Sequence, residues 1–314
     1  MTTNNPVALS ALVRPGAIVT QLWPAAPEEA GGTIRALEAI RGEDFFEAAM
    51  IAPVPDAGER RDVAAMVADG GPTLTYCLIP VMGEKGWNLS TGEGALRRRS
   101  VDSVLGLLDE AREVGAGAVM VGSGPAQSEP AERTAALGRL TESFDELCAA
   151  AATAGLQVVI EPLDVLVHKK QTLGYTPEAV ALAQAMARHG AAMSLCLDTS
   201  HMTLNGEDIV DCLALAGSYA DTLHFCNCVT DPGHPLYGDH HPPLGAPGYL
   251  DVPEMARLMA AAVRIGFFTP ERRIEVCVEV FNHNAGDFEA GRAIMRAGRS
   301  ALERAWAQAA AGAF

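Results

Sequence analysis

The sequence has no apolar run long enough to cross a bilayer. A membrane-spanning helix needs about 20 consecutive apolar residues, and no apolar segment of this chain approaches that length. The opening residues, "MTTNNPVALS", also lack the basic region and apolar core of a secretory signal. We therefore expect a cytoplasmic protein without membrane association.

Basic residues are scarce, since 23 Lys and Arg face 39 Asp and Glu and leave a net charge of −16. A surface with this excess of negative charge repels phosphate backbones. The charge therefore argues against a nucleic-acid partner. A small-molecule substrate, even an anionic one, is compatible with it.

No two cysteines form a C-x-x-C pair. Most of the seven cysteines lie in apolar segments, and we expect them to be small buried residues in a reducing compartment. Cys226 and Cys228 bracket Asn227 on a predicted strand and share one face, so a thiolate pair there is an alternative metal site.

A glycine-rich phosphate loop after the first strand is also missing, which disfavours a doubly wound open sheet. Instead, strand-like and helix-like segments alternate about eight times, with short connections and no linker. With 314 residues, 49% of them apolar, the chain suits one (β/α)8 barrel. We predict a single TIM-barrel domain over residues 1–314, in which "VALSAL" and "GAIVTQLW" compete as the first strand.

Four of the later strands carry, at or near their carboxyl ends, a residue of a type that commonly binds metals. These are Glu161 after "VVI", Asp198 after "LCL", His224 in "TLHFCN" and Glu279 in "VCVEVF". The carboxyl ends of barrel strands meet at one mouth, where these groups would repel one another without a cation. We predict one divalent ion, Mn²⁺ first, with Mg²⁺, Co²⁺ and Zn²⁺ as alternatives. The competing interpretation is that each residue caps a helix or pairs with an arginine.

Histidines near these strand ends are candidate general bases, because an imidazole titrates near neutral pH. His201 follows Asp198 closely and is expected in the same mouth. The loop of residues 230–250 is long enough to be functional, and its candidate polar groups are His234, Asp239, His240 and His241. We expect an ordered lid edge with His240 or His241 at the rim of the metal pocket; a polar surface loop is the alternative.

Five strings occur in an order that resembles the xylose-isomerase-like barrel superfamily, in its sugar phosphate isomerase/epimerase branch. They are "VVIEPLD", "LCLDTSHM", "TLHFCN", "GAPGYLDVPEM" and "EVCVEVF". The resemblance implies that Glu161, Asp198, His224 and Glu279 bind the metal and that His201 contacts substrate. It also implies an enzyme that isomerises or epimerises a keto sugar through an enediolate. Two ligand carboxylates on opposite sides, Glu161 and Glu279, could then remove and return protons.

The chain also departs from that pattern. Val167 stands where ketose 3-epimerases carry a second glutamate, and the arginine that often follows the strand-7 histidine is missing. The loop "NCVTDPGHPLYGDHHPPLG" resembles instead the large subunit of bacterial C-glycoside deglycosidases of the same superfamily. That resemblance implies a lyase that removes a proton beside the ketone of a 3-keto C-glycoside and expels the aglycone. It also implies a small β-rich partner subunit.

Two other classes fit less well. A nuclease of this fold, like endonuclease IV, needs a three-metal cluster with more ligands and a basic surface. A non-catalytic sugar-binding barrel would not need metal-binding residues at all four strand ends. We expect an oligomer and, because no lysine–glycine phosphate loop is present, a substrate without phosphate.

Overall fold

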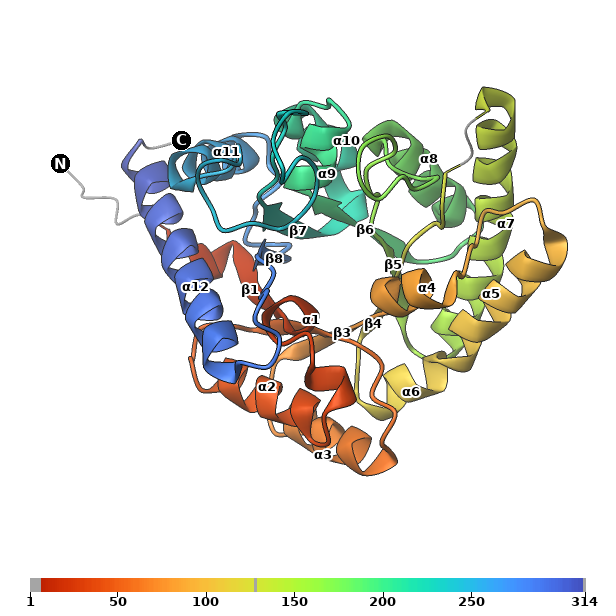
Figure 1. The fold of residues 1–314 in the computed structure, drawn as a ribbon, viewed down its shortest axis with the longest axis horizontal. Coiled ribbons are helices and arrows are strands. Elements are labelled where there is room, and N and C mark those ends of the chain that lie inside the picture. Colours follow the sequence, from red (N-terminus) through yellow and green to blue (C-terminus); the bar gives the residue numbers. More distant parts are fainter. Residues whose placement is uncertain (1–6, 127–128, 313–314) are drawn as a thin grey trace.

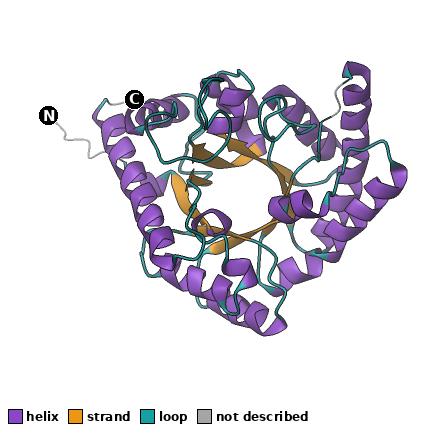
Figure 2. Cartoon of the chain, in the orientation of Figure 1, coloured by secondary structure: helices purple, strands orange, loops and turns teal. Residues whose placement is uncertain are grey.

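The computed structural model describes residues 7–126 and 129–312, and in these residues eight parallel strands close into a barrel (Figures 1 and 2). Each strand pairs with the next along the chain, and the first pairs with the last. This confirms the predicted (β/α)8 TIM barrel. The strands are β1 (Val13–Ile18), β2 (Ala48–Ile51), β3 (Thr73–Cys77), β4 (Ala118–Val121), β5 (Gln157–Ile160), β6 (Met193–Asp198), β7 (Ala220–Cys226) and β8 (Ile274–Glu279).

Helices surround the ring of strands, as Figure 2 shows. Short helices follow some strands directly, and longer ones form the outer jacket. They are α1 (Val19–Leu22), α2 (Gly32–Arg41), α3 (Ala57–Ala68), α4 (Ile79–Lys85), α5 (Gly94–Gly106), α6 (Leu108–Glu113), α7 (Pro130–Thr153), α8 (Thr176–Arg188), α9 (Thr199–Leu204), α10 (Ile209–Ala216), α11 (Val252–Arg264) and α12 (Phe288–Ala311). Among the described residues, no helix has the length and apolar character that a bilayer span requires.

The described residues from position 7 onward decide which of the two competing segments forms the first strand. The segment "VALSAL" contains a short 3₁₀ helix, Leu9–Ala11, and β1 overlaps only the start of "GAIVTQLW". The first long helix, α2, begins at Gly32. Gly31 before it has a φ of 68°, which glycine adopts readily.

The core has two layers because both faces of a barrel sheet are covered. Outward-facing strand residues pack against the helices. Inward-facing residues fill the barrel, and these are Ile18, Met50, Cys77, Met120, Val159, Cys196 and Cys277. The seven cysteines all lie in described residues, and all are free and buried, as the sequence predicts. The packed interior leaves the carboxyl ends of the strands as the place for a site.

Candidate metal centre and its cavity

Four acidic or imidazole side chains converge at the carboxyl end of the barrel. Asp198 and Glu279 are the last residues of β6 and β8, His224 lies on β7, and Glu161 directly follows β5. Each offers one ligand atom, and these atoms lie within 4.8 Å of one another. All four residues are buried. The structure thus brings together the four residues that the sequence singles out as candidate ligands.

Three atoms of this cluster lack a hydrogen-bond partner in the described part of the chain: Asp198 Oδ2, His224 Nδ1 and Glu279 Oε2. His224 Nδ1 lies 2.7 Å from Glu279 Oε2 and 3.8 Å from Asp198 Oδ2, but it is not aligned as a donor to either. Leaving a buried polar atom without a partner costs about 1–3 kcal/mol. A divalent cation between these atoms would satisfy all three, so the residues fit a metal ion.

The two oxygens of Asp198 fit the two interpretations of the sequence: one caps a helix, and the other faces the candidate metal cluster. Its Oδ1 accepts hydrogen bonds from the backbone N–H groups of Ser200, at 2.6 Å, and His201, at 3.2 Å. That oxygen caps the start of α9. Its Oδ2 faces the cluster without a partner. A helix cap and a metal ligand are therefore compatible in this side chain.

The charges of the cluster are unfavourable without a cation. Burial raises the pKa of Asp198 to about 6, and the nearby carboxylates of Glu279 and Asp239 add to the increase although His201 opposes it. Burial also acts to raise the pKa of Glu279, but the imidazoles of His241 and His224 outweigh it and hold that pKa well below its usual range. A bound dication would favour ionised carboxylates throughout the cluster.

Neighbouring side chains orient the candidate ligands. The Gln21 side-chain amide donates to Glu279 Oε1 at 2.7 Å. On the far side of its ring, His224 places Nε2 3.4 Å from the Cys196 sulfur. Contacts of this kind fix ring orientation and proton position at metal sites. They leave His224 Nδ1 and Glu279 Oε2 as the atoms that face the cluster.

A chain of charged groups extends from Glu279 toward the loop that follows β7. His241 Nδ1 lies 3.1 Å from Glu279 Oε1, and His241 Nε2 lies 2.6 Å from Asp239 Oδ2. Asp239 also accepts a hydrogen bond from the Ser200 hydroxyl at 2.6 Å, and its Oδ2 is 3.1 Å from Lys169 Nζ. Burial lowers the pKa of His241, but Glu279 and Asp239 overcome that effect and raise it to about 10. This environment keeps the His241 ring protonated and charged.

His201 is buried beside the same chain. Burial lowers its pKa, whereas Asp239 and Asp164 raise it, and the result is about 9. The backbone N–H of Asp164 lies 3.3 Å from His201 Nδ1 and donates to it when the ring is neutral, with its proton on Nε2. A cation at the nearby cluster would offset the carboxylates that favour the charged ring, so the neutral ring belongs to the metal-loaded protein and the charged ring to the metal-free one.

The other loop histidines do not reach this centre. The His240 ring packs against the His168 ring with centroids 4.4 Å apart, and His240 does not line the cavity described below. His234 accepts a local hydrogen bond from the backbone N–H of Leu236. Of the loop histidines that the sequence nominates, the structure brings only His241 to the candidate centre.

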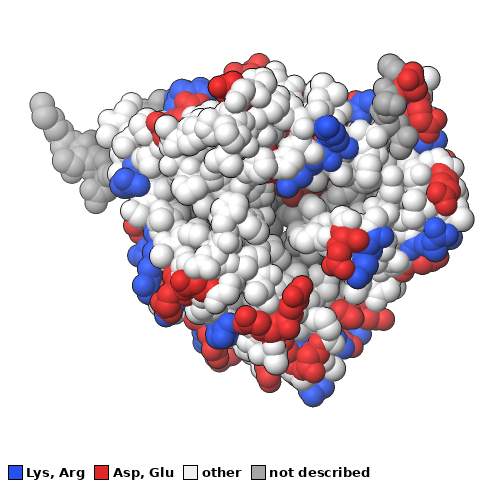
Figure 3. Space-filling model, viewed as in Figure 1, with Lys and Arg blue, Asp and Glu red and all other residues white. Residues whose placement is uncertain are grey.

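A cavity of about 390 Å³ opens above the cluster, within the size range of small-molecule sites. The polar and charged residues that line it include Glu161, Lys169, His201, His224, His241 and Glu279. Its apolar lining includes Ile79, Pro80, Met82, Trp87 and Met120. Figure 3 shows this end of the barrel, with a hollow near its centre and basic side chains at the edge of that hollow.

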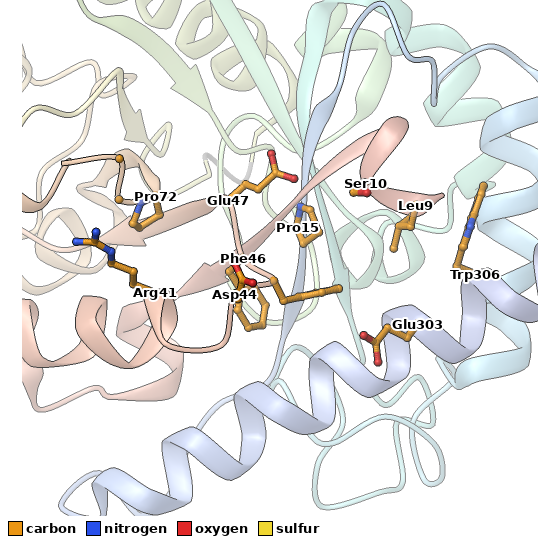
Figure 4. A pocket seen from close by; sticks show the side chains of 13 residues that line it. Leu9, Ser10, Pro15, Arg41, Asp44, Phe46, Glu47, Pro72, Glu303 and Trp306 are labelled. Atoms are coloured by element: carbon orange, nitrogen blue, oxygen red, sulfur yellow. The ribbon is translucent and has the colours of Figure 1, made fainter. Parts of the chain in front are cut away.

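A larger cavity of about 880 Å³ lies at the opposite end of the barrel (Figure 4). Its lining includes Pro15, Glu47 and Pro72, which lie at or near the amino-terminal ends of strands, and Glu303 and Trp306 of α12. No histidine or cysteine lines it among the described residues. Active sites of TIM barrels lie at the carboxyl ends of the strands, so the smaller cavity is the candidate site despite its size.

These features define a class of protein: a TIM barrel with a buried carboxylate–imidazole cluster at the carboxyl ends of its strands. The chain belongs to the xylose isomerase-like TIM barrel family, whose sequence profile matches residues 34–304. A comparison with curated protein sequences found no match.

Solved structures with this fold include sugar epimerases. D-psicose 3-epimerase from Clostridium cellulolyticum H10 is 19% identical, with a TM-score of 0.68 over 95% of this chain and 99% of that chain. E. coli 3-keto-D-glucoside 4-epimerase is 15% identical, with a TM-score of 0.64 over 92% and 99%. The IolI protein with a bound zinc atom is 13% identical, with a TM-score of 0.70 over 93% and 98%. At these identities the likeness shows the shared fold.

Sequence analysis did not assign site positions to Gln21, Asp164 or Lys169, and it named Asp239 only as a candidate polar group of the loop. Asp239 and Lys169 had a detectable signal, because each stands among charged residues in a loop after a ligand-bearing strand. Gln21 had none, since it stands alone in an apolar segment and meets Glu279 only through the closure of the barrel. Asp164 ends "EPLD", and its role depends on contacts formed in the folded loop.

Proposed function

We propose that this protein is a divalent-metal-dependent isomerase or epimerase that acts on a keto sugar through an enediolate. One observation carries the proposal: three buried polar atoms without partners, on Asp198, His224 and Glu279, face one another below the cavity. The family supports it, as do structural neighbours that are sugar epimerases.

The ligands in this proposal are Glu161, Asp198, His224 and Glu279. A bound divalent ion supplies positive charge that polarises a carbonyl and its neighbouring hydroxyl and stabilises the enediolate. We expect Mn²⁺ first, while the zinc in one structural neighbour keeps Zn²⁺ among the alternatives together with Mg²⁺ and Co²⁺. The set of three carboxylates and one imidazole suits any of them.

The chain's own groups move the protons. Glu161 and Glu279 both line the cavity, and each carboxylate can accept the proton beside the ketone or return it to the opposite face. Gln21 and His241 hold Glu279 Oε1, so they set the orientation and basicity of this carboxylate. His201 carries its proton on Nε2 and is placed to donate a hydrogen bond to a substrate oxygen.

A second candidate is a lyase that cleaves a 3-keto C-glycoside, as in the C-glycoside deglycosidases. The contact of His241 with Asp239 and the apolar lining of the cavity favour it, because a bare monosaccharide needs neither. In this reaction a glutamate takes the proton beside the ketone, the bond from sugar to aglycone breaks, and the aglycone carbon takes a proton. His241, held charged between two carboxylates, lines the cavity and can supply this proton.

The proposal extends to the assembly of the protein and to its location in the cell. We propose an oligomer in the cytoplasm, joined by a small β-rich subunit if the lyase activity is present. The free, buried cysteines support a reducing compartment.

The test compares proton exchange with aglycone release. The protein is loaded with Mn²⁺, and ¹H NMR in D₂O follows the proton beside the ketone of 3-keto glucosides and of ketohexoses. Exchange or epimerisation without aglycone release supports the isomerase, and release supports the lyase. If the metal-loaded protein catalyses neither reaction on any of these sugars, the proposal fails.

Substitutions of the loop histidines test which of them donates the proton in the lyase reaction. We expect His241→Ala to slow aglycone release more than tenfold, a loss of at least about 1.4 kcal/mol of transition-state stabilisation. His240→Ala is the matched control, because His240 lies one residue away and packs on His168 outside the cavity lining. Equal effects of the two substitutions would remove His241 as the proton donor.

A further inference from the structure

Two loops that carry cavity residues contact each other at the carboxyl end of the barrel. The β5 loop spans residues 161–175, and the β7 loop spans residues 227–251. Lys169 and Gln171 of the β5 loop and His241 of the β7 loop line the cavity. The shape of the cavity therefore depends on how these two loops meet.

A pair of imidazole rings forms the central contact between the loops. The His168 ring of the β5 loop packs on the His240 ring of the β7 loop, with centroids 4.4 Å apart and ring planes inclined by 37°. Tilted contacts between aromatic rings are favourable, and two neutral imidazoles can pack in this way. In the described part of the chain neither ring lines the cavity, so the pair joins the loops from outside it.

The backbone of the β7 loop also lies close to this ring pair. Gly238 has a φ of 111°, and a Cβ at this position would lie 3.2 Å from His168 Cβ and 3.3 Å from His168 Nδ1. A methyl group there would press on the His168 ring. Next to it, Lys169 Nζ lies 3.1 Å from Asp239 Oδ2. The loops are thus joined through residues 168–169 on one side and 238–240 on the other.

The charged groups around the His168 ring keep it neutral at neutral pH. Burial lowers the pKa of His168, and the positive charge of Lys169 and the His240 ring lower it further, while Asp239 and Asp164 oppose the decrease. A folded-state pKa below the unfolded value of about 6.5 means that the contact is intact above that pH and weakens as pH falls. Acid therefore acts against the ring pair.

The two nearby carboxylates have partners already and cannot each compensate a new positive charge. Asp239 has the His241 ring on Oδ2, at 2.6 Å, and the Ser200 hydroxyl on Oδ1, at 2.6 Å. Asp164 accepts hydrogen bonds from the backbone N–H groups of residues 167–169. Protonation of both stacked rings would add two like charges beside the ammonium of Lys169, and these charges repel one another.

We propose that His168 and His240 form a pH-sensitive joint, which holds the β5 and β7 loops together while both rings are neutral and separates them when both are protonated. Opening moves Lys169 away from His241, so the cavity loses its shape in mild acid. Removal of one ring adds no charge and leaves the contact between Lys169 and Asp239 in place. The inference goes beyond the proposed reaction and does not depend on it.

The experiment measures opening of the loops by amide hydrogen exchange. The Mn²⁺-loaded protein is followed by mass spectrometry from about pH 7.5 to about pH 5, and each rate is divided by the intrinsic rate at that pH to give an opening constant. Repulsion between two unit charges about 4 Å apart in water changes an equilibrium constant about fivefold. We expect a rise of this size in residues 166–171 and 235–241, with no rise in β3.

Substitutions separate the charge of the rings from their packing. His240→Phe and His168→Phe keep a stacked ring that cannot be protonated, so their opening constants should change less than twofold over this pH range. Gly238→Ala should open the joint at every pH, because its methyl group presses on His168. His234→Phe is the matched control: His234 belongs to the same loop but bonds locally to Leu236, and this variant should keep the wild-type profile.

Three results would overturn the joint. One is a wild-type opening constant that stays flat down to about pH 5, and another is an acid-induced rise that persists in both phenylalanine variants. The third is an equal rise in β3, which would mean that acid loosens the whole barrel. Exchange reports on the loops without a sugar present, so the joint can fail or stand whichever reaction the protein catalyses.

Discussion

At the scale of single residues, the two oxygens of Asp198 have separate roles that substitution can resolve. Asparagine keeps an oxygen that can cap α9 but places an uncharged amide toward the cluster. We expect Asp198→Asn to fold normally and to lose most of its bound metal and activity. Asp198→Ala should lose these and also the cap, which costs about 0.5–2 kcal/mol. Elemental analysis and urea unfolding of the metal-free proteins check both effects, and full metal content in either variant would contradict the assignment.

His241 should make the stability of the metal-free protein depend on pH. The pKa of His241 is raised to about 10 in the folded chain, against about 6.5 when unfolded. The folded state therefore binds the proton more tightly, and its contribution is fully present below about pH 6.5. It is lost as pH rises toward 10.

Urea unfolding between pH 6 and 10 measures this dependence. We expect the free energy of unfolding to fall with rising pH in the metal-free protein and to fall less in His241→Gln. His201 titrates in the same direction, with a pKa raised to about 9, so the variant should flatten the profile without abolishing the slope. An unchanged profile in His241→Gln would show that the ring is neutral in the fold.

At the scale of elements, the loop after β7 is secured by one side chain. Asn227 Nδ2 donates to the carbonyl oxygens of Pro243, at 2.8 Å, and Gly245, at 2.9 Å, while its Oδ1 accepts from the backbone N–H of Leu250 at 2.8 Å. Asn227 is fully buried, and a Cβ at Gly248 would lie only 2.2 Å from its Oδ1. This close packing fixes the segment that carries His241.

We expect Asn227→Ala to loosen this loop and to cost roughly 3 kcal/mol, about 1 kcal/mol for each hydrogen bond. Hydrogen exchange in residues 239–250 should accelerate, and KM for the sugar should rise while metal content stays unchanged, because Asn227 contacts no candidate ligand. Asn205→Ala is a control, since Asn205 bonds to the loop after β5 instead. Exchange in residues 239–250 that matches the wild type would show that other contacts hold the loop.

At the scale of the whole molecule, a bound ion should stabilise the fold because the ligands come from four different strand ends. An ion present at a hundred times its Kd adds about 2.7 kcal/mol to the free energy of unfolding. For a chain of this size the gain corresponds to a rise in Tm of roughly 5 °C. Differential scanning calorimetry with Mn²⁺, Mg²⁺, Co²⁺ and Zn²⁺, each reversed by EDTA, measures it. No shift with any of these ions would argue against the metal centre, and the order of the shifts identifies the preferred ion.

Much of the architecture follows from local sequence. Apolar runs such as "LCL" before Asp198 and "VVI" before Glu161 form buried strands because both faces of the sheet are covered. The carboxyl ends of parallel strands in a closed barrel must meet, so the four candidate ligands could be named from their positions along the chain. The start of the chain was harder, because two apolar segments competed and only pairing with β2 and β8 selects Val13–Ile18 as β1.

By itself the sequence determined the barrel, the residues at its strand ends and the excess of negative charge, because these depend on the period, spacing and composition of nearby residues. The tertiary structure alone decided which oxygen of Asp198 stays free, why His241 rather than His240 reaches the cavity, and where Lys169 points. Gln21 and Glu279 are separated by 258 positions in the chain and meet only when the barrel closes. Such contacts depend on the packing of distant segments, and no local pattern in the sequence encodes the direction in which a loop side chain points.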